Sequence, residues 1–110
     1  MNIFKIMFGA VIFALFGVSQ AVAVDRSICD SGANVEFYPN GSLRECVLKE
    51  SFTLDGIKCN EHHTIQFYDN GRLKTCDLAE ATTVGDQKCK QFSPIEFYPD
   101  GKFKSCVKAD

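Results

Sequence analysis

The sequence has little of what a nucleic-acid-binding or membrane-embedded protein requires. Its 110 residues hold 12 Lys and Arg against 14 Asp and Glu, a net charge of −2 at pH 7. Nucleic acids and anionic membrane surfaces are bound by clustered basic charge, so this balance predicts neither as a partner. No second long apolar run follows the first 23 residues, which predicts a soluble product without stable membrane insertion.

The sequence also has few groups suited to catalysis or metal binding. Histidine occurs only at His62 and His63, beside Glu61. Such a pair could ligate a metal or act as a general base, but an exposed loop is the favoured interpretation. Zinc sites bring cysteines within roughly two to four residues of each other, whereas the six cysteines here alternate at 17 and 13. With no serine in a nucleophile elbow, we expect no enzyme, no metal and no cofactor.

The first 23 residues have the pattern of a cleaved secretory signal. Lys5 precedes an almost unbroken apolar run over residues 6–18, and small residues follow at Ala21-Val22-Ala23. The run is shorter than the about 20 residues that span a bilayer. We therefore expect a signal peptide at 1–23 and a single β-repeat domain at 24–110, secreted or periplasmic. In such an oxidising compartment disulfides persist.

One segment occurs three times at a step of 30 residues. Residues 35–46 read VEFYPNGSLREC, residues 65–76 read IQFYDNGRLKTC, and residues 95–106 read IEFYPDGKFKSC. A second cysteine keeps the same step at Cys29, Cys59 and Cys89. This period indicates one supersecondary unit copied along an array, with units at 29–58, 59–88 and 89–110.

Each copy predicts a β-hairpin with a three-residue loop, at 39–41, 69–71 and 99–101. Gly at the third loop position can take the left-handed conformation that closes a type I turn with a bulge. The loop predicts these facing residues: Tyr38 and Ser42, Phe37 and Leu43, Glu36 and Arg44, Gln66 and Lys74, Glu96 and Lys104. The core face then holds Val35, Phe37, Leu43, Ile65, Phe67, Leu73, Ile95, Phe97 and Phe103. The opposite face holds Tyr38, Glu36, Arg44 and Cys46.

Shorter strands are predicted after the first two hairpins. Phe52-Thr53-Leu54 leads to a turn at Asp55-Gly56, and Thr82-Thr83-Val84 leads to a turn at Gly85-Asp86. No stretch has helical periodicity. We predict an all-β fold of three hairpin repeats in an open single-sheet array. The alternative is a closed pseudo-threefold ring, because Val24-Asp25 stands one repeat step before Leu54-Asp55.

The repeat reduces the possible disulfide pairings to two schemes. Pairing within units gives Cys29–Cys46, Cys59–Cys76 and Cys89–Cys106. Pairing between units gives Cys46–Cys59 and Cys76–Cys89, and only a closed ring could join the remaining Cys29 and Cys106. We favour pairing within units because it fits either architecture. Each bridge should contribute about 3 kcal/mol to a domain too small to rely on its core alone.

Equivalent tyrosines and cations form the candidate binding face: Tyr38, Tyr68, Tyr98, Arg44, Lys74 and Lys104. An aromatic stripe bordered by cations favours recognition of a protein or a glycan. The competing interpretation is that each tyrosine packs over its own turn and disulfide. We predict a binding or structural role in the cell envelope or extracellular space. The alternative is a secreted inhibitor or effector that acts through an exposed loop such as 60–64.

The segments Phe37-Tyr38-Pro39-Asn40-Gly41-Ser42-Leu43 and Phe97-Tyr98-Pro99-Asp100-Gly101-Lys102-Phe103 resemble the MORN-variant repeats. The likeness covers about eight residues of each unit. It implies an extended sheet of hairpins that serves interaction rather than catalysis. The repeat step here is longer than in that family, and the cysteines are additional.

Overall fold

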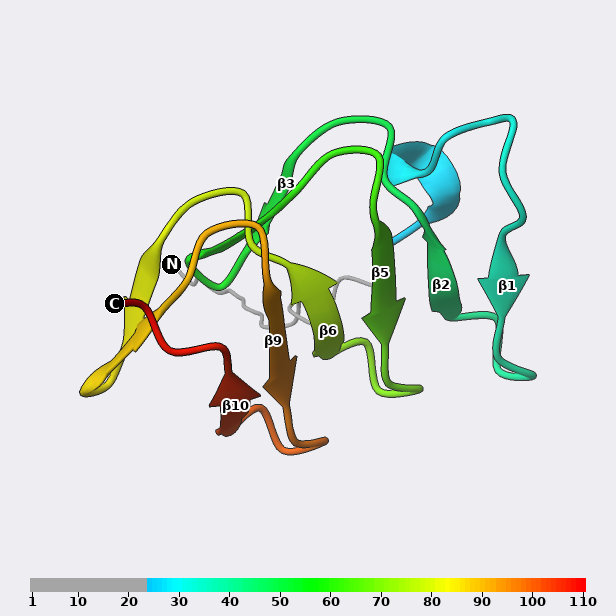
Figure 1. The fold of residues 1–110 in the computed structure, drawn as a ribbon. Coiled ribbons are helices and arrows are strands. Elements are labelled where there is room, and N and C mark those ends of the chain that lie inside the picture. The colour runs from blue at the N-terminus through cyan, green and yellow to red at the C-terminus, as the bar shows by residue number, and fades with distance from the viewer. Residues whose placement is uncertain (1–23) are drawn as a thin grey trace, which may run out of the picture.

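The computed structural model describes residues 24–110, which form an open array of antiparallel hairpins (Figure 1). The predicted signal peptide lies outside the described residues. Six strands build one sheet in the order β1-β2-β5-β6-β9-β10. Their bounds are Glu36–Phe37, Leu43–Val47, Thr64–Phe67, Leu73–Asp77, Pro94–Phe97 and Phe103–Cys106. The prediction of an open all-β array is confirmed, and the ends of the sheet do not meet to form a ring.

The three tight turns of the sheet match their prediction. In the first hairpin, the Tyr38 amide donates to the Ser42 carbonyl at 2.8 Å, and the Gly41 amide donates to the Tyr38 carbonyl at 2.9 Å. Gly41 has φ of 90°, in the left-handed region that glycine enters without steric cost. The same bonds recur in the other two copies, so the three loops lie in a row along one end of the sheet (Figure 1).

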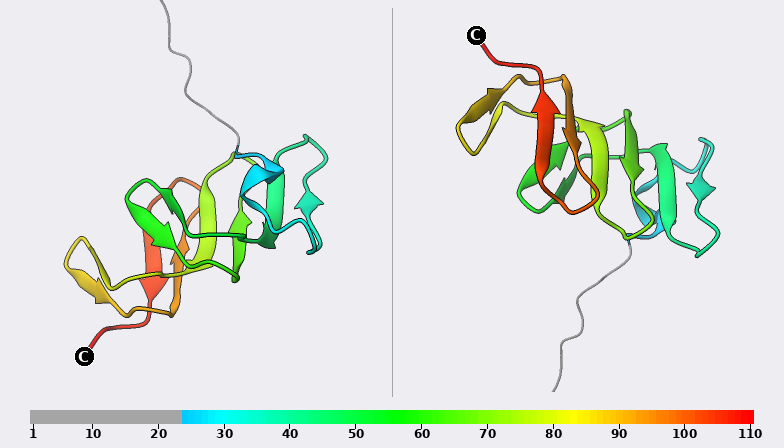
Figure 2. Two further views of the ribbon diagram at one scale, coloured as in Figure 1. Left: turned by 90° about the horizontal axis from the view of Figure 1, so that it is seen from above. Right: turned by 90° about the horizontal axis from the view of Figure 1, so that it is seen from below.

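Two further hairpins form separate two-stranded sheets. They are β3 (Phe52–Leu54) with β4 (Ile57–Cys59), and β7 (Thr82–Val84) with β8 (Gln87–Cys89). Their turns also match the sequence: Asp55 and Gly56 have φ of 52° and 81°, as an Asp-Gly turn requires, and Gly85 has φ of 60°. Each hairpin leaves the sheet on the same side and reaches toward the β10 end (Figures 1 and 2).

The predicted register is wrong beyond the second residue pair from the turn, Phe37 with Leu43. Phe37 faces Leu43 as expected, but Glu36 faces Glu45 and not Arg44. A β-bulge inserts one extra residue into the returning strand at this point. The other copies repeat it, because Gln66 faces Thr75 and Glu96 faces Ser105.

Because of the bulge, Cys46 does not lie on the face that the sequence predicts. Beyond the extra residue, side chains of the returning strand change face. Cys46 therefore shares the core face with Leu43, and both are buried. The prediction that it lies on the tyrosine face is wrong.

The core lies between the sheet and the short hairpins, where sulfur and aliphatic side chains meet. Its fully buried members include Phe67, Leu48, Ile65, Leu78, Ile95, Cys46, Cys59 and Cys89. The disulfides are Cys29–Cys46, Cys59–Cys76 and Cys89–Cys106, so the prediction of pairing within units is confirmed. Three disulfides in so small a chain are typical of an oxidising compartment.

The chain enters the array through a short 3-10 turn, η2 (Arg26–Ile28). Asp25 caps it by accepting a hydrogen bond from the Ser27 amide at 2.9 Å. Hydrogen bonds from the side chain and the backbone of Ser27 lower the pKa of Asp25. Within residues 24–110, no helix has the length and hydropathy needed to cross a bilayer.

Candidate binding face

Each tyrosine of the candidate binding face lies beside the cation of its own hairpin. The Arg44 guanidinium carbon is 5.8 Å from the centre of the Tyr38 ring. The ammonium nitrogens of Lys74 and Lys104 are 5.7 and 5.8 Å from the rings of Tyr68 and Tyr98. These distances are within the range of cation–π attraction. The face therefore carries three copies of one tyrosine–cation pair.

The strand arrangement determines the spacing of these pairs. Equivalent strands of neighbouring repeats are separated by one intervening strand. Strands in a sheet lie about 4.8 Å apart, so successive tyrosine–cation pairs lie about 10 Å apart. The pairs form a line that crosses the strands.

The tyrosine hydroxyls connect successive repeats, a role that the sequence analysis did not identify. Tyr38 Oη donates to the Phe67 carbonyl at 2.7 Å, and Tyr68 Oη donates to the Phe97 carbonyl at 2.7 Å. The hydroxyls thus reach the next repeat rather than their own turn. The recurrence of tyrosine one residue before each loop was the available signal, but it does not say which carbonyl the hydroxyl would reach.

Loop asparagines make a second set of connections. Asn40 Nδ2 donates to the Asp69 carbonyl at 2.9 Å, and Asn70 Nδ2 donates to the Pro99 carbonyl at 2.8 Å. The side-chain oxygens of the same asparagines accept the backbone amides two residues on, at 2.9 Å. Each asparagine therefore closes its own loop and holds the next one, which keeps the row of loops ordered.

Carboxylates balance the cations at the two ends of the face. Arg44 Nε lies 3.8 Å from Glu36 Oε1, and Lys104 Nζ lies 3.8 Å from Glu96 Oε1. These pairs are half exposed and contribute little to stability. In the middle repeat Gln66 replaces the acid, and it donates to Glu45 Oε1 at 3.1 Å. Lys74 therefore has a neutral residue where the other two cations have a carboxylate.

The face is shallow. A depression of about 60 Å³ lies between the first two repeats, lined by Tyr38, Arg44, Glu45, Gln66, Phe67 and Lys74. A space of this size holds only a few water molecules. It suits contact with an extended surface or chain better than enclosure of a small molecule.

The two histidines are exposed and have different partners. His63 Nδ1 lies 3.0 Å from Asp77 Oδ2, and His62 Nε2 lies 3.7 Å from Glu61 Oε2. His62 has φ of 63°. Within residues 24–110, the structure brings together no group of three or more His, Cys, Asp or Glu side chains suited to hold a metal ion.

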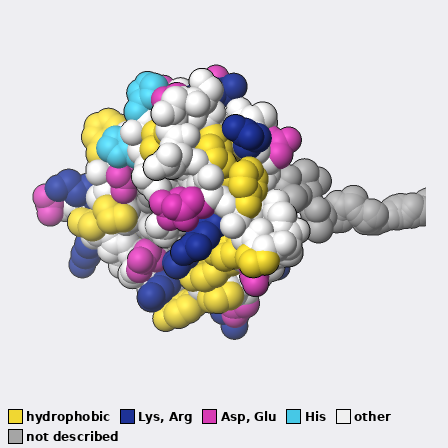
Figure 3. Space-filling view, turned by 90° about the vertical axis from the view of Figure 1, so that its right-hand side faces the viewer, with side chains coloured by type: hydrophobic (Ala, Val, Ile, Leu, Met, Phe, Trp, Pro, Cys, Tyr) yellow, Lys and Arg dark blue, Asp and Glu magenta, His cyan; other side chains and the backbone are white. Residues whose placement is uncertain are grey.

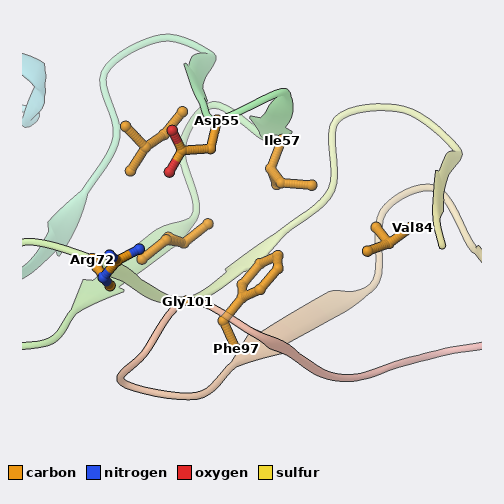
Figure 4. A pocket seen from close by; sticks show the side chains of 8 residues that line it. Asp55, Ile57, Arg72, Val84, Phe97 and Gly101 are labelled. Carbon is orange, nitrogen blue, oxygen red and sulfur yellow. The ribbon is translucent and has the colours of Figure 1, made fainter.

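A larger hollow, which the sequence analysis did not predict, lies on the hairpin side of the sheet. It has a volume of about 160 Å³ and is lined by Leu54, Asp55, Ile57, Arg72, Leu73, Val84, Phe97 and Gly101. Asp55 and Arg72 stand at its margin, and the Phe97 ring points into it (Figure 4). Arg72 packs against the loop of the next repeat: a Cβ added at Gly101 would come 2.5 Å from Arg72 Nη1.

Comparisons with known proteins found no relative: no family model, no curated protein and no solved structure matches this chain. The resemblance to MORN-variant repeats therefore stays a prediction. The small, disulfide-rich all-β fold is compatible with a binding or structural role outside the cytoplasm.

Proposed function

We propose that this chain is an exported repeat protein of the cell envelope or extracellular space, and that it acts by binding rather than by catalysis. The partner that the candidate binding face suits best is a protein or an extended glycan. The resemblance to MORN-variant repeats, whose role is interaction, agrees with this proposal. The predicted signal sequence and the three disulfides support export.

The observation that carries the proposal is the line of three equivalent tyrosine–cation pairs, one with Arg and two with Lys. Tyr38 and Tyr68 are tied to the next repeat through their hydroxyls, so their rings lose little freedom when a ligand binds. Preorganised aromatic side chains bind with a smaller entropy cost. A polymer whose recognised units recur at about 10 Å could contact successive pairs at once.

The proposal is tested by removing the cations together. We expect the triple variant Arg44→Ala, Lys74→Ala and Lys104→Ala to lose at least tenfold in affinity for the ligand bound by the wild type. The ligand is sought among immobilised neutral and acidic oligosaccharides and purified envelope proteins. The matched control is Lys49→Ala, Lys88→Ala and Lys90→Ala, which removes the same charge from exposed positions outside the face. The control should bind as the wild type does.

The alternative of a loop-acting inhibitor or effector predicts the opposite pattern. Changing His62 and His63 to alanine would then abolish binding, while the triple cation variant would retain it. That result would contradict the proposed role of the tyrosine–cation pairs.

A further inference from the structure

The two ends of the array present opposite halves of the contact that joins its repeats. Between repeats, a tyrosine hydroxyl on one side meets a phenylalanine carbonyl on the other. At the β10 end, the Tyr98 hydroxyl has no acceptor among residues 24–110. At the β1 end, the Phe37 carbonyl occupies the acceptor position of the repeat, and no tyrosine within that range reaches it. One end thus has an unused donor and the other an unused acceptor.

Of the four large hydrophobic side chains that are exposed among residues 24–110, Phe37, Tyr98 and Val107 lie at the same two ends, and Phe92 lies in the loop before β9. Phe37 at the β1 end is 45% exposed, whereas its counterpart Phe67, inside the array, is 1% exposed. Tyr98 and Val107 at the β10 end are 48% and 44% exposed. Figure 3 views the β1 end, where hydrophobic side chains lie at the surface among charged ones. Both ends therefore expose hydrophobic side chains that a neighbouring repeat would bury.

We propose that the β10 end of one copy of this chain binds the β1 end of a second copy, head to tail. The contact continues the pairing of β2 with β5 and of β6 with β9, which is antiparallel. Adding 30 residues to each position of the β6–β9 register gives the residues at the β10 end that would face the β1 end of the second copy. They are Ser105 with Glu36, Cys106 with Val35, and Val107 with Asn34 of the second copy.

The charges at the two ends are complementary in this register. Inside the array, Gln66 lies between Arg44 and Lys74 and bonds Glu45. Glu36 takes the place of Gln66 in the contact between copies. Its carboxylate then lies beside the Lys104 ammonium and the Ser105 hydroxyl of the first copy, and it can accept a charge-assisted hydrogen bond from either.

Two residues of the last repeat weaken the contact. Asp100 stands where Asn40 and Asn70 donate to the next loop, and a carboxylate cannot donate to a carbonyl. Lys108 stands where Leu48 and Leu78 are buried, and an edge lysine opposes strand pairing. The association is therefore weak and reversible. Because the two surfaces differ, it adds copies in a row without closing.

The test is sedimentation equilibrium of the oxidised protein, residues 24–110, from low micromolar concentration to about 1 mM, the Kd range of weak complexes. We expect the average mass of the wild type to rise with concentration without a plateau at the dimer. Asp100→Asn restores the missing amide donor and should tighten association roughly fivefold. Tyr98→Phe removes the hydroxyl donor and should weaken it by a similar factor.

The controls separate association from folding. Asp100→Asn places at an exposed loop position the residue that the other copies already carry there, so it should fold. Tyr68→Phe removes a hydrogen bond inside the array and should leave the association constant unchanged. A wild type that stays monomeric at about 1 mM, or a mass that stops at the dimer, overturns the proposal. The outcome is independent of whether the tyrosine–cation pairs bind another ligand.

Discussion

At the scale of single residues, equivalent positions of the repeat differ where their neighbours differ. Tyr38 and Tyr68 are partly buried and hydrogen-bonded to the next repeat, while Tyr98 is exposed. Leu48 and Leu78 are buried, whereas the same position in the last repeat is the exposed Lys108. A repeat at the end of an array has no neighbour to bury such side chains, so a polar residue is tolerated or favoured there.

The tyrosine hydroxyls provide a prediction about stability. Tyr38→Phe and Tyr68→Phe each leave a part-buried carbonyl without its donor, and each should lower the free energy of unfolding by about 1–2 kcal/mol. Tyr98→Phe should change it by less than about 0.5 kcal/mol, because the Tyr98 hydroxyl makes no hydrogen bond within residues 24–110. Urea denaturation of the oxidised proteins measures all three. Equal effects at the three positions would show that the hydroxyls do not join the repeats.

At the scale of elements, the bulge decides which side chains meet. It inserts Arg44 between Leu43, which faces Phe37, and Glu45, which faces Glu36. Arg44 nevertheless stays near Glu36, at 3.8 Å, so the expected opposite charges are neighbours without being directly paired. A sign of the bulge was present in the sequence. Leu43 and Cys46 are both apolar but an odd number of residues apart, which a regular strand cannot place on one face.

The short hairpins allow a direct test of turn geometry. Gly85 begins its turn with φ of 60°, whereas Asp86 does not have positive φ. Gly85→Ala should lower the free energy of unfolding by about 1–2 kcal/mol, the cost of a left-handed conformation for an L-residue. Asp86→Ala should have little effect. The measurement is again urea denaturation, and equal tolerance of the two changes would contradict the turn assignment.

At the scale of the whole molecule, the last disulfide is less protected from solvent than the central one. Both cysteines of the central bridge are buried, at 0% and 3% exposure. Cys106 of the last bridge lies on the edge strand β10 and is only partly buried. In a repeat array each unit is stabilised mainly by its immediate neighbours. Within residues 24–110, the first and the last unit each have a neighbour on one side only.

This asymmetry predicts the order in which the bridges are reduced. The three bridges close loops of the same length, with a sequence separation of 17, so loop entropy does not distinguish them. The order should therefore depend on how easily the reductant reaches each bridge. Cys89–Cys106 should be reduced before Cys59–Cys76. Partial reduction, alkylation and peptide mass spectrometry reveal the order. Earlier labelling of the central bridge would contradict it.

The sequence alone determined the strands and the turns, and it favoured the disulfide pairing within units and the open array over their alternatives. These features follow from local chemistry: apolar alternation, Asn-Gly and Asp-Gly loops, and a constant cysteine step. The six residues of the candidate binding face were also named from the sequence, because the repeat makes them equivalent.

Only the tertiary structure decided the bulge, the core position of Cys46, the acceptor of each tyrosine hydroxyl and the hollow beside Arg72. Each of these depends on how one repeat lies against the next. A hydrogen bond from Tyr38 to Phe67 joins successive repeats across a sequence separation of 29, and local sequence preferences carry no information on contacts at that separation. The physical reason is that turns and alternation act within a hairpin, whereas donors, acceptors and buried surfaces are matched between hairpins.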